Sequence, residues 1–215
     1  MSRIALIHAL AHSVAPVNAA FASDWPDATC MNLLDDSLSA DLARSNRGLD
    51  EAMHARFQAL TSYALSTGAD GVLFTCSAFG PCIERVAALH PAVPVLKPNE
   101  AMVAEASAIG KPIGLIATFA PTLDSMPREF PDGLPLQLAL AEGALAALNA
   151  GNSALHDRLV AEQAQRLRQQ GCEVIALAQF SMARARKRCE ADTGLPVLTT
   201  VDSAVAALKR RLAPA

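Results

Sequence analysis

The sequence predicts an α/β protein of two pseudo-symmetric lobes, each a mainly parallel sheet flanked by helices, with an active-site cleft between them. Two observations lead to this prediction. Short, continuously apolar runs alternate with longer stretches typical of helices, as in parallel strands that are covered on both faces. The pattern also repeats, because residues 171–178 match residues 68–75 at an offset of 103, and residues 195–198 match residues 93–96 at an offset of 102.

The repeat has a simple alternative, since any two strand–helix units resemble each other to some degree. Shared glycine and proline positions favour duplication, and residues 112–117 also resemble the first strand, residues 4–8. We therefore predict lobe one over residues 1–97 and lobe two over residues 98–199. The C-terminal helix, residues 200–215, is expected to return to lobe one.

The individual elements follow from the same apolar periodicity. In lobe one we expect strands at residues 3–7, 29–34, 72–74 and 93–96, and helices at about 16–23, 49–67 and 81–89. Gly68 ends the long helix, and the residues leading up to Gly48 are expected to form a loop. In lobe two we expect strands at 112–117, 171–178 and 195–198, with helices from about 100, over 153–169 and from about 202.

Composition narrows the class of protein. The 215 residues are 52% hydrophobic and carry a net charge of −3, which gives no reason to expect nucleic acid or a membrane as partner. Five cysteines without a CxxC pair indicate reduced thiols and a cytoplasmic protein. Residues 1–22 loosely mimic a signal peptide, but His8, His12 and Pro16 interrupt the apolar run, so we interpret them as the first strand. The expected partner is a small-molecule carboxylate substrate, and a homo-oligomer is left open.

The stretch from Gly71 to Pro81 places a thiol where ligands bind in this class of fold. Residues 72–74 predict a buried strand, Cys76 follows at its carboxyl end, and Pro81 suits the first turn of a helix. Backbone N–H groups and the positive end of that helix are expected to lower the cysteine pKa. The alternative is a small buried hydrophobic residue, but the polar neighbours Thr75 and Ser77 favour a functional thiol.

Three features together resemble the aspartate/glutamate/hydantoin racemase superfamily: Phe-Thr-Cys-Ser-Ala at 74–78, Gly-Leu-Ile-Ala-Thr at 114–118, and the repeat itself. The resemblance covers nearly the whole chain. It implies an enzyme without metal or organic cofactor, like the amino-acid and hydantoin racemases, maleate isomerase and arylmalonate decarboxylase of that superfamily. In its racemases one cysteine from each lobe flanks the substrate α-carbon, and the first of these falls on Cys76.

The chain departs from this pattern in lobe two. The offset of 103 places Gln179 opposite Cys76, and a carboxamide cannot exchange a proton near neutral pH. Cys172 lies at the wrong end of its strand, and Cys189 lies well along the next helix. Single-cysteine members of the superfamily include decarboxylase-like ones. We therefore predict a cofactor-independent isomerase or racemase-type enzyme that uses Cys76 for proton transfer at the α-carbon of a small, amino acid-like carboxylate. The alternatives are a single-cysteine lyase such as a decarboxylase, or a non-catalytic small-molecule-binding homologue.

The candidate site residues lie in four loops that follow strands. Backbone N–H groups there are expected to stabilise an enediolate-like intermediate, hydroxyl groups to add donors, and two phenylalanines to wall an apolar pocket. The catalytic candidates are Cys76, His8 and Gln179. The expected substrate-binding residues are Thr75, Ser77, Ala78, Phe79, Thr118, Phe119, Ala120, Phe180 and Ser181. No metal ligand is expected.

Several other polar residues have structural interpretations of equal or greater weight. His8 ends the first strand and is either an acid or base in the cleft or a histidine satisfied within the fold. Asp35 and Asp36 end the second strand, where turn capping is favoured over contact with a substrate amine. Glu100 and Asp202 are interpreted as first-turn acids that the helix dipole favours.

Overall fold

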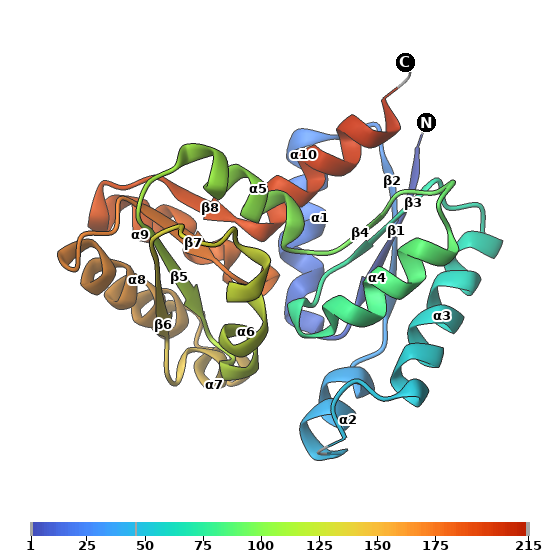
Figure 1. Cartoon of the computed structure of the whole chain (residues 1–215), viewed down its shortest axis with the longest axis horizontal. Helices are drawn as coiled ribbons and strands as arrows, with labels where there is room; N and C mark the ends of the chain where they lie inside the picture. Colours follow the sequence, from blue (N-terminus) through green and yellow to red (C-terminus); the bar gives the residue numbers. More distant parts are fainter. Residues whose placement is uncertain (1, 46, 214–215) are drawn as a thin grey trace. The chain divides into compact units, whose positions relative to one another are not determined.

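The computed structural model describes residues 2–45 and 47–213, and the chain divides into two compact units. Unit one comprises Met1–Pro98 with Ala204–Ala215, and unit two comprises Asn99–Ser203 (Figure 1). Each unit has its own four-stranded parallel sheet flanked by helices, which confirms the predicted fold class. The cleft between the lobes stays a prediction.

The sheet of unit one has the strand order β2-β1-β3-β4, and all neighbours are parallel. Its strands are β1 (Arg3–His8), β2 (Thr29–Leu34), β3 (Gly71–Phe74) and β4 (Val95–Leu96). The central strands β1 and β3 are apolar on both faces because helices cover both sides of them. Strand β2 lies at the sheet edge and is correspondingly more exposed.

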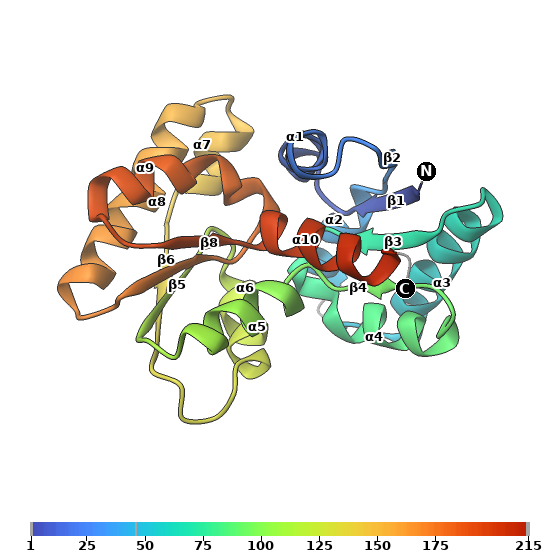
Figure 2. The same ribbon diagram turned by 90° about the horizontal axis from the view of Figure 1, so that it is seen from above.

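Helices cover the two faces of this sheet (Figures 1 and 2). One face packs against α2 (Ser37–Ser45), α3 (Glu51–Ser66) and α4 (Gly80–Leu89), through buried residues such as Leu38, Phe57 and Ile83. The other face carries α1 (Val14–Asp24) and α10 (Thr200–Leu212), and Gly71 allows the close approach of α10. Two short 3₁₀ helices, η1 (Ala11–Ser13) and η2 (Ser77–Phe79), follow β1 and β3.

Helix α2 corrects the sequence-based expectation of a loop before Gly48. Leu38 and Leu42 lie one helical turn apart, and both pack on the core of unit one. The long helix α3 was predicted, and Asp50 caps it by accepting a hydrogen bond from the Met53 backbone N–H. Gly68 follows α3 with a φ of 82°, a left-handed conformation that glycine adopts without strain.

Unit two repeats the topology, with strand order β6-β5-β7-β8. Its strands are β5 (Ile113–Ala117), β6 (Leu136–Leu140), β7 (Val174–Leu177) and β8 (Val197–Thr199). Its helices are α5 (Glu100–Ile109), α6 (Ala120–Ser125), α7 (Ala144–Asn149), α8 (Ser153–Gln169) and α9 (Arg186–Thr193), with the 3₁₀ helices η3 (Met126–Glu129) and η4 (Phe180–Ala185). One face packs on α7, α8 and α9, and the other on α5 and η3.

The registers of the two sheets define which residues correspond. In unit one Ile7 pairs with Phe74, and in unit two Ile116 pairs with Leu177. Beyond these pairs the two units make equivalent backbone hydrogen bonds. The Thr75 N–H donates to the Ile7 carbonyl in unit one, and the Ala178 N–H donates to the Ile116 carbonyl in unit two. This places Cys76 and Gln179 at equivalent positions, one residue beyond each of these hydrogen bonds.

Candidate active site

Cys76 lies at the carboxyl end of β3, in extended backbone that leads into η2 and then α4. The four residues of β3 are all buried, whereas Cys76 is half-buried and so reaches solvent. Pro81 occupies the first turn of α4, as the sequence predicted. The strand, the turn and the helix start therefore hold the thiol at the end of the sheet where ligands bind in α/β folds.

Two groups that can donate a hydrogen bond to a thiolate lie at the sulfur of Cys76. They are the backbone N–H of Ala78 and the hydroxyl of Ser39 on α2. Burial raises the pKa of the Cys76 thiol, and these two hydrogen bonds lower it by less. The thiol is therefore protonated at neutral pH, and the predicted lowering of its pKa is wrong in direction, because desolvation of the thiolate outweighs the nearby donors.

The hydroxyl of Ser39 has a second acceptor within reach. It donates to the carbonyl oxygen of Ala9 at 2.9 Å, and a serine hydroxyl has only one proton to donate. When Cys76 is protonated, the Ser39 hydroxyl donates its proton to the Ala9 carbonyl, and its oxygen can accept a hydrogen bond from the thiol. When Cys76 becomes a thiolate, the hydroxyl must turn from Ala9 to the sulfur to stabilise the charge.

The other predicted site residues of this loop differ in how far they are buried. Thr75 and Ser77 are buried, and Ala78 is half-buried. Phe79 is fully buried and packs on Phe57 with ring centroids 5.0 Å apart, so its ring belongs to the core. Only the backbone of Phe79 is therefore available to a ligand. This corrects the expectation that the Phe79 ring forms a wall of the pocket.

His8 is fully buried, and both of its ring nitrogens are hydrogen-bonded within unit one. Nδ1 lies 2.9 Å from the Thr75 hydroxyl, and Nε2 lies 2.9 Å from Oδ1 of Asn32. Asn32 in turn donates from Nδ2 to Oδ1 of Asn18 on α1, at 3.2 Å. Of the two readings of His8 that the sequence left open, these contacts favour the histidine satisfied within the fold.

The asparagine orientations select one tautomer of His8. Because Oδ1 of Asn32 can only accept, Nε2 must carry the proton, and Nδ1 accepts from the Thr75 hydroxyl. Burial lowers the pKa of His8, and the hydrogen bond to Asn32 opposes this shift. The imidazole is therefore neutral at pH 7.

In unit two, Gln179 occupies the position equivalent to Cys76, half-buried in extended backbone after β7. Its Oε1 accepts two hydrogen bonds from Thr118, one from the backbone N–H at 2.6 Å and one from the hydroxyl at 2.9 Å. The carboxamide is thus fixed in one orientation. Within the described residues no hydrogen bond is made by its Nε2.

This arrangement corrects the expectation for Thr118. Its N–H and its hydroxyl were predicted to bind the substrate, but both are used by Gln179. Phe119 is half-buried and Ala120 is exposed at the start of α6. Phe180 and Ser181 are buried, so the Phe180 ring packs inside unit two and does not wall an open pocket.

Asp35 behaves as a structural residue. Its carboxylate accepts hydrogen bonds from Ser37 and Arg56, and these lower its pKa although burial opposes the shift. Arg56 also bridges to Asp41 at 2.8 Å, which ties α3 to α2. The favoured interpretation of a capping and turn residue therefore agrees with its contacts.

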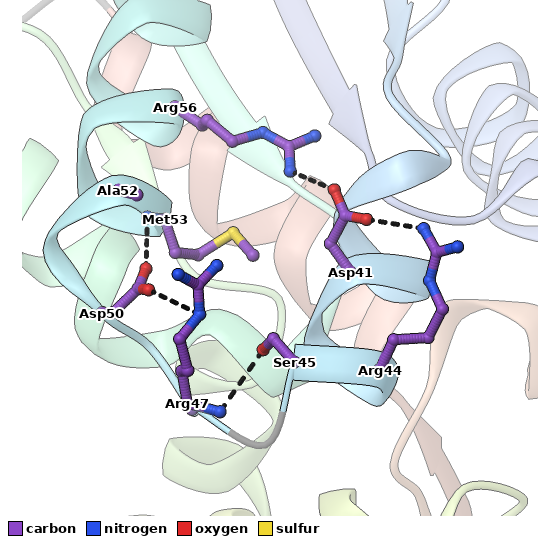
Figure 3. Close-up of a pocket in the computed structure, with 9 residues that line it drawn as sticks. Asp41, Arg44, Ser45, Arg47, Asp50, Ala52, Met53 and Arg56 are labelled. Atoms are coloured by element: carbon purple, nitrogen blue, oxygen red, sulfur yellow. Dashed lines mark hydrogen bonds and ion pairs between the residues drawn. The ribbon is translucent and has the colours of Figure 1, made fainter.

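A surface pocket of about 340 Å³ lies between α2 and the start of α3 (Figure 3). Each of its three arginines is engaged in an ion pair within the pocket, because Arg44 and Arg56 share Asp41 and Arg47 pairs with Asp50. Among the described residues that line it, none is a cysteine or a histidine. The pocket therefore lacks the groups for the predicted chemistry.

Neither a metal-binding cluster nor a membrane-spanning helix is found in the described part of the chain. In residues 2–45 and 47–213, no group of three or more His, Cys, Asp or Glu residues is placed to hold a metal ion. In the same residues, no helix has the length and apolar character needed to span a bilayer.

Comparison with known proteins identifies the family. The family profile described as Asp/Glu/Hydantoin racemase matches residues 11–208. The chain belongs to the Asp/Glu/hydantoin racemase family. No curated protein sequence gives a significant match.

Solved structures of two racemases and of a maleate isomerase have a similar fold. Aspartate racemase of Picrophilus torridus is similar with a TM-score of 0.72 and 12% identity, over 98% of this chain and 94% of that one. Allantoin racemase of Pseudomonas fluorescens has a TM-score of 0.69 and 20% identity, over 97% and 89%. The maleate isomerase Iso of Pseudomonas putida S16 has a TM-score of 0.70 and 15% identity, over 98% and 92%. At these identities the likeness concerns the fold.

Within this racemase-family fold, sequence reasoning missed two contacts of the candidate site. Ser39 was overlooked because α2 was taken for a loop, although the Leu38–Leu42 spacing is the signal for that helix. The Gln179–Thr118 pair was missed because the partners are far apart in sequence and join only through the pairing of β5 with β7.

The surroundings of Cys76 predict how its reactivity depends on pH. Its alkylation rate by iodoacetamide should rise with pH to a midpoint above 9.0, the ordinary value for a thiol, because burial disfavours the thiolate. Ser39→Ala should slow the reaction roughly fivefold at pH 8, since one hydrogen bond to the thiolate is lost. Peptide mapping by mass spectrometry gives the rate for each cysteine, and a midpoint below 9.0 would contradict this prediction.

His8 predicts a pH dependence of stability. Because its folded pKa lies below the ordinary 6.5, its contribution to stability is complete above pH 6.5 and is lost as pH falls through the folded value. Replacing His8 by Asn should therefore reduce the fall in unfolding free energy between pH 7 and pH 5. Urea unfolding of both proteins at several pH values measures this, and parallel pH profiles would refute the prediction.

Proposed function

We propose that this racemase-family protein catalyses cofactor-independent proton transfer at the α-carbon of a small carboxylate, with Cys76 as the proton-carrying group. The observation that supports this most directly is the placement of Cys76. It is a partly exposed thiol at the carboxyl end of β3, where ligands bind in α/β folds, with two groups beside its sulfur that can donate to a thiolate. The cysteines at 82, 172 and 189 are buried and unsuited to this role.

The protonation state of Cys76 favours a proton donor. In the proposed reaction the α-C–H bond of the substrate breaks and its proton passes to a solvent base. The carbanion left next to the carboxylate takes the thiol proton, so the S–H bond breaks, a new C–H bond forms and a thiolate remains. The Ala78 N–H and the Ser39 hydroxyl then stabilise that thiolate. Solvent returns the proton to sulfur before the next cycle.

Gln179 has a different role in this proposal. Its Oε1 is held by both donors of Thr118, so its Nε2 protons point away from that residue. We assign Nε2 to an acceptor oxygen of the substrate, either of a carboxylate or of a carbonyl. A carboxamide stabilises negative charge on oxygen without moving a proton, and this suits an enediolate-like intermediate.

A second candidate is a decarboxylase-type lyase, which the raised pKa of Cys76 also supports. In this reaction the bond between the α-carbon and a second carboxylate breaks and CO₂ leaves. The carbanion then takes the proton from Cys76. Because one thiol delivers the proton, both reactions should yield a single enantiomer.

The role of Cys76 is tested by turnover in heavy water. Small amino acids, hydantoins, malonates and unsaturated diacids are screened by NMR for deuterium incorporation or CO₂ release. Replacing Cys76 by Ala should reduce turnover of the best substrate at least about a thousandfold, whereas Cys30→Ala should leave it unchanged. Ligand binding without any turnover would support the binding homologue, and full activity of Cys76→Ala would sink the proposal.

Gln179 predicts a second effect on the same substrate. Gln179→Met keeps the size of the side chain but removes the donor, so kcat/KM should fall roughly tenfold. Gln179→Glu should be worse, because a carboxylate repels an anionic substrate. Steady-state kinetics of both variants, with Gln165→Met on the outer surface of α8 as the matched control, measure this, and a Met variant with unaltered kinetics would exclude the assigned role.

A further inference from the structure

A line of polar side chains crosses the sheet of unit one on one face. It runs from Thr75 after β3, through His8 at the end of β1, to Asn32 on β2 and Asn18 on α1. With the tautomer derived above, each group donates to the next in one direction, from the threonine hydroxyl to Oδ1 of Asn18. His8 is the centre of this line and is fully buried.

Unit two has no such line at the equivalent positions. The two registers match His8 with Ala117, Thr75 with Ala178 and Asn32 with Leu138. Nevertheless, both strand ends make the same backbone hydrogen bonds, from Thr75 to Ile7 and from Ala178 to Ile116. The backbone of this fold therefore reaches its strand-end geometry with apolar side chains alone.

The polar line has an energetic cost that the apolar version avoids. An imidazole and a hydroxyl lose water when they are buried, and their mutual hydrogen bonds return only about that cost. Local departures of this kind are expected at functional sites, where stability is not the only requirement. The line occurs in the unit that carries the thiol, directly beside Cys76.

We propose that His8 is a positioning residue that orients the Cys76 thiol through Thr75. Successive side chains of a strand point to opposite faces, so Thr75 and Cys76 lie on either side of the same peptide. The backbone hydrogen bond to Ile7 sets the position of that peptide, and anchoring the Thr75 hydroxyl on His8 adds a side-chain restraint that limits its residual motion. This restraint keeps the sulfur within reach of Ala78 and Ser39. The proposal rests on the proposed role of Cys76, and it makes His8 neither acid nor base in the reaction.

The first test compares two buried histidines. In His8→Leu the thiolate of Cys76 should lose alignment with its donors, so the midpoint of its alkylation profile should rise and its rate at pH 8 should fall roughly fivefold. His156→Leu is the matched control, because His156 is also fully buried but lies in unit two and contacts Asp157. Its loss should destabilise the protein without changing the alkylation of Cys76.

A second pair guards against misfolding of the His8 variant. Thr75→Ser keeps the hydroxyl, whereas Thr75→Val keeps the shape and removes it. The Val variant should reproduce the slow alkylation of His8→Leu, and the Ser variant should alkylate within about twofold of the unaltered protein. In the unaltered protein, ¹⁵N NMR should show His8 as a neutral imidazole with its proton on Nε2 at pH 7.

The outcomes separate this inference from the proposed function. Unchanged alkylation in both His8→Leu and Thr75→Val, or a His8 proton on Nδ1, would overturn the positioning role whatever the reaction is. Full turnover by Cys76→Ala would instead overturn the proposed function. Slower Cys76 alkylation in both variants, with the His156→Leu and Thr75→Ser rates preserved, would support the positioning role.

Discussion

The parallel pairing of β1 with β3 is the constraint on which the candidate site depends. It brings His8 and Thr75 to the same edge of the sheet, and the hydrogen bond from the Thr75 N–H to Ile7 sets where the strand stops. Cys76 is then the first residue that is free of the ladder. The same pairing between β5 and β7 sets the position of Gln179 and brings it to Thr118. The two strand pairings therefore place both candidate residues at the carboxyl ends of their strands, where ligands bind in α/β folds.

The fold could be predicted from the sequence to a large extent, because buried strands are continuously apolar and their helices are long. The strand before Cys76 and the helix after Asp50 are examples. Helix α2 was not predicted, because Asp and Ser residues at its start resemble a turn and only two leucines mark its buried face. Strand β6 was missed as well, since an edge strand is half-exposed and lacks a continuous apolar pattern.

The candidate site was predictable in its positions but not in its electrostatics. Sequence spacing located Cys76 and Gln179, because the repeat keeps its register. The direction of the thiol pKa shift depends on how much water the folded chain excludes, which no local pattern encodes. Likewise, the donors of Thr118 and the nitrogens of His8 find their partners only through tertiary contacts. Hydrogen bonds between residues that are distant in sequence are therefore the feature of the candidate site that could not be predicted without a structure.

The single proton of the Ser39 hydroxyl links the charge of Cys76 to the docking of a whole helix. While the sulfur is neutral, the Ser39 hydroxyl donates this proton to the Ala9 carbonyl and so connects α2 to the residue that follows β1. Ionisation of the sulfur removes the hydrogen bond from Ser39 to Ala9, since the hydroxyl must turn to the thiolate. By reciprocity, any ligand or contact that presses α2 against Ala9 favours the neutral thiol, and any that loosens α2 favours the thiolate. One hydroxyl of helix α2 therefore couples the charge state of the Cys76 sulfur to a hydrogen bond that holds this helix to the chain after β1.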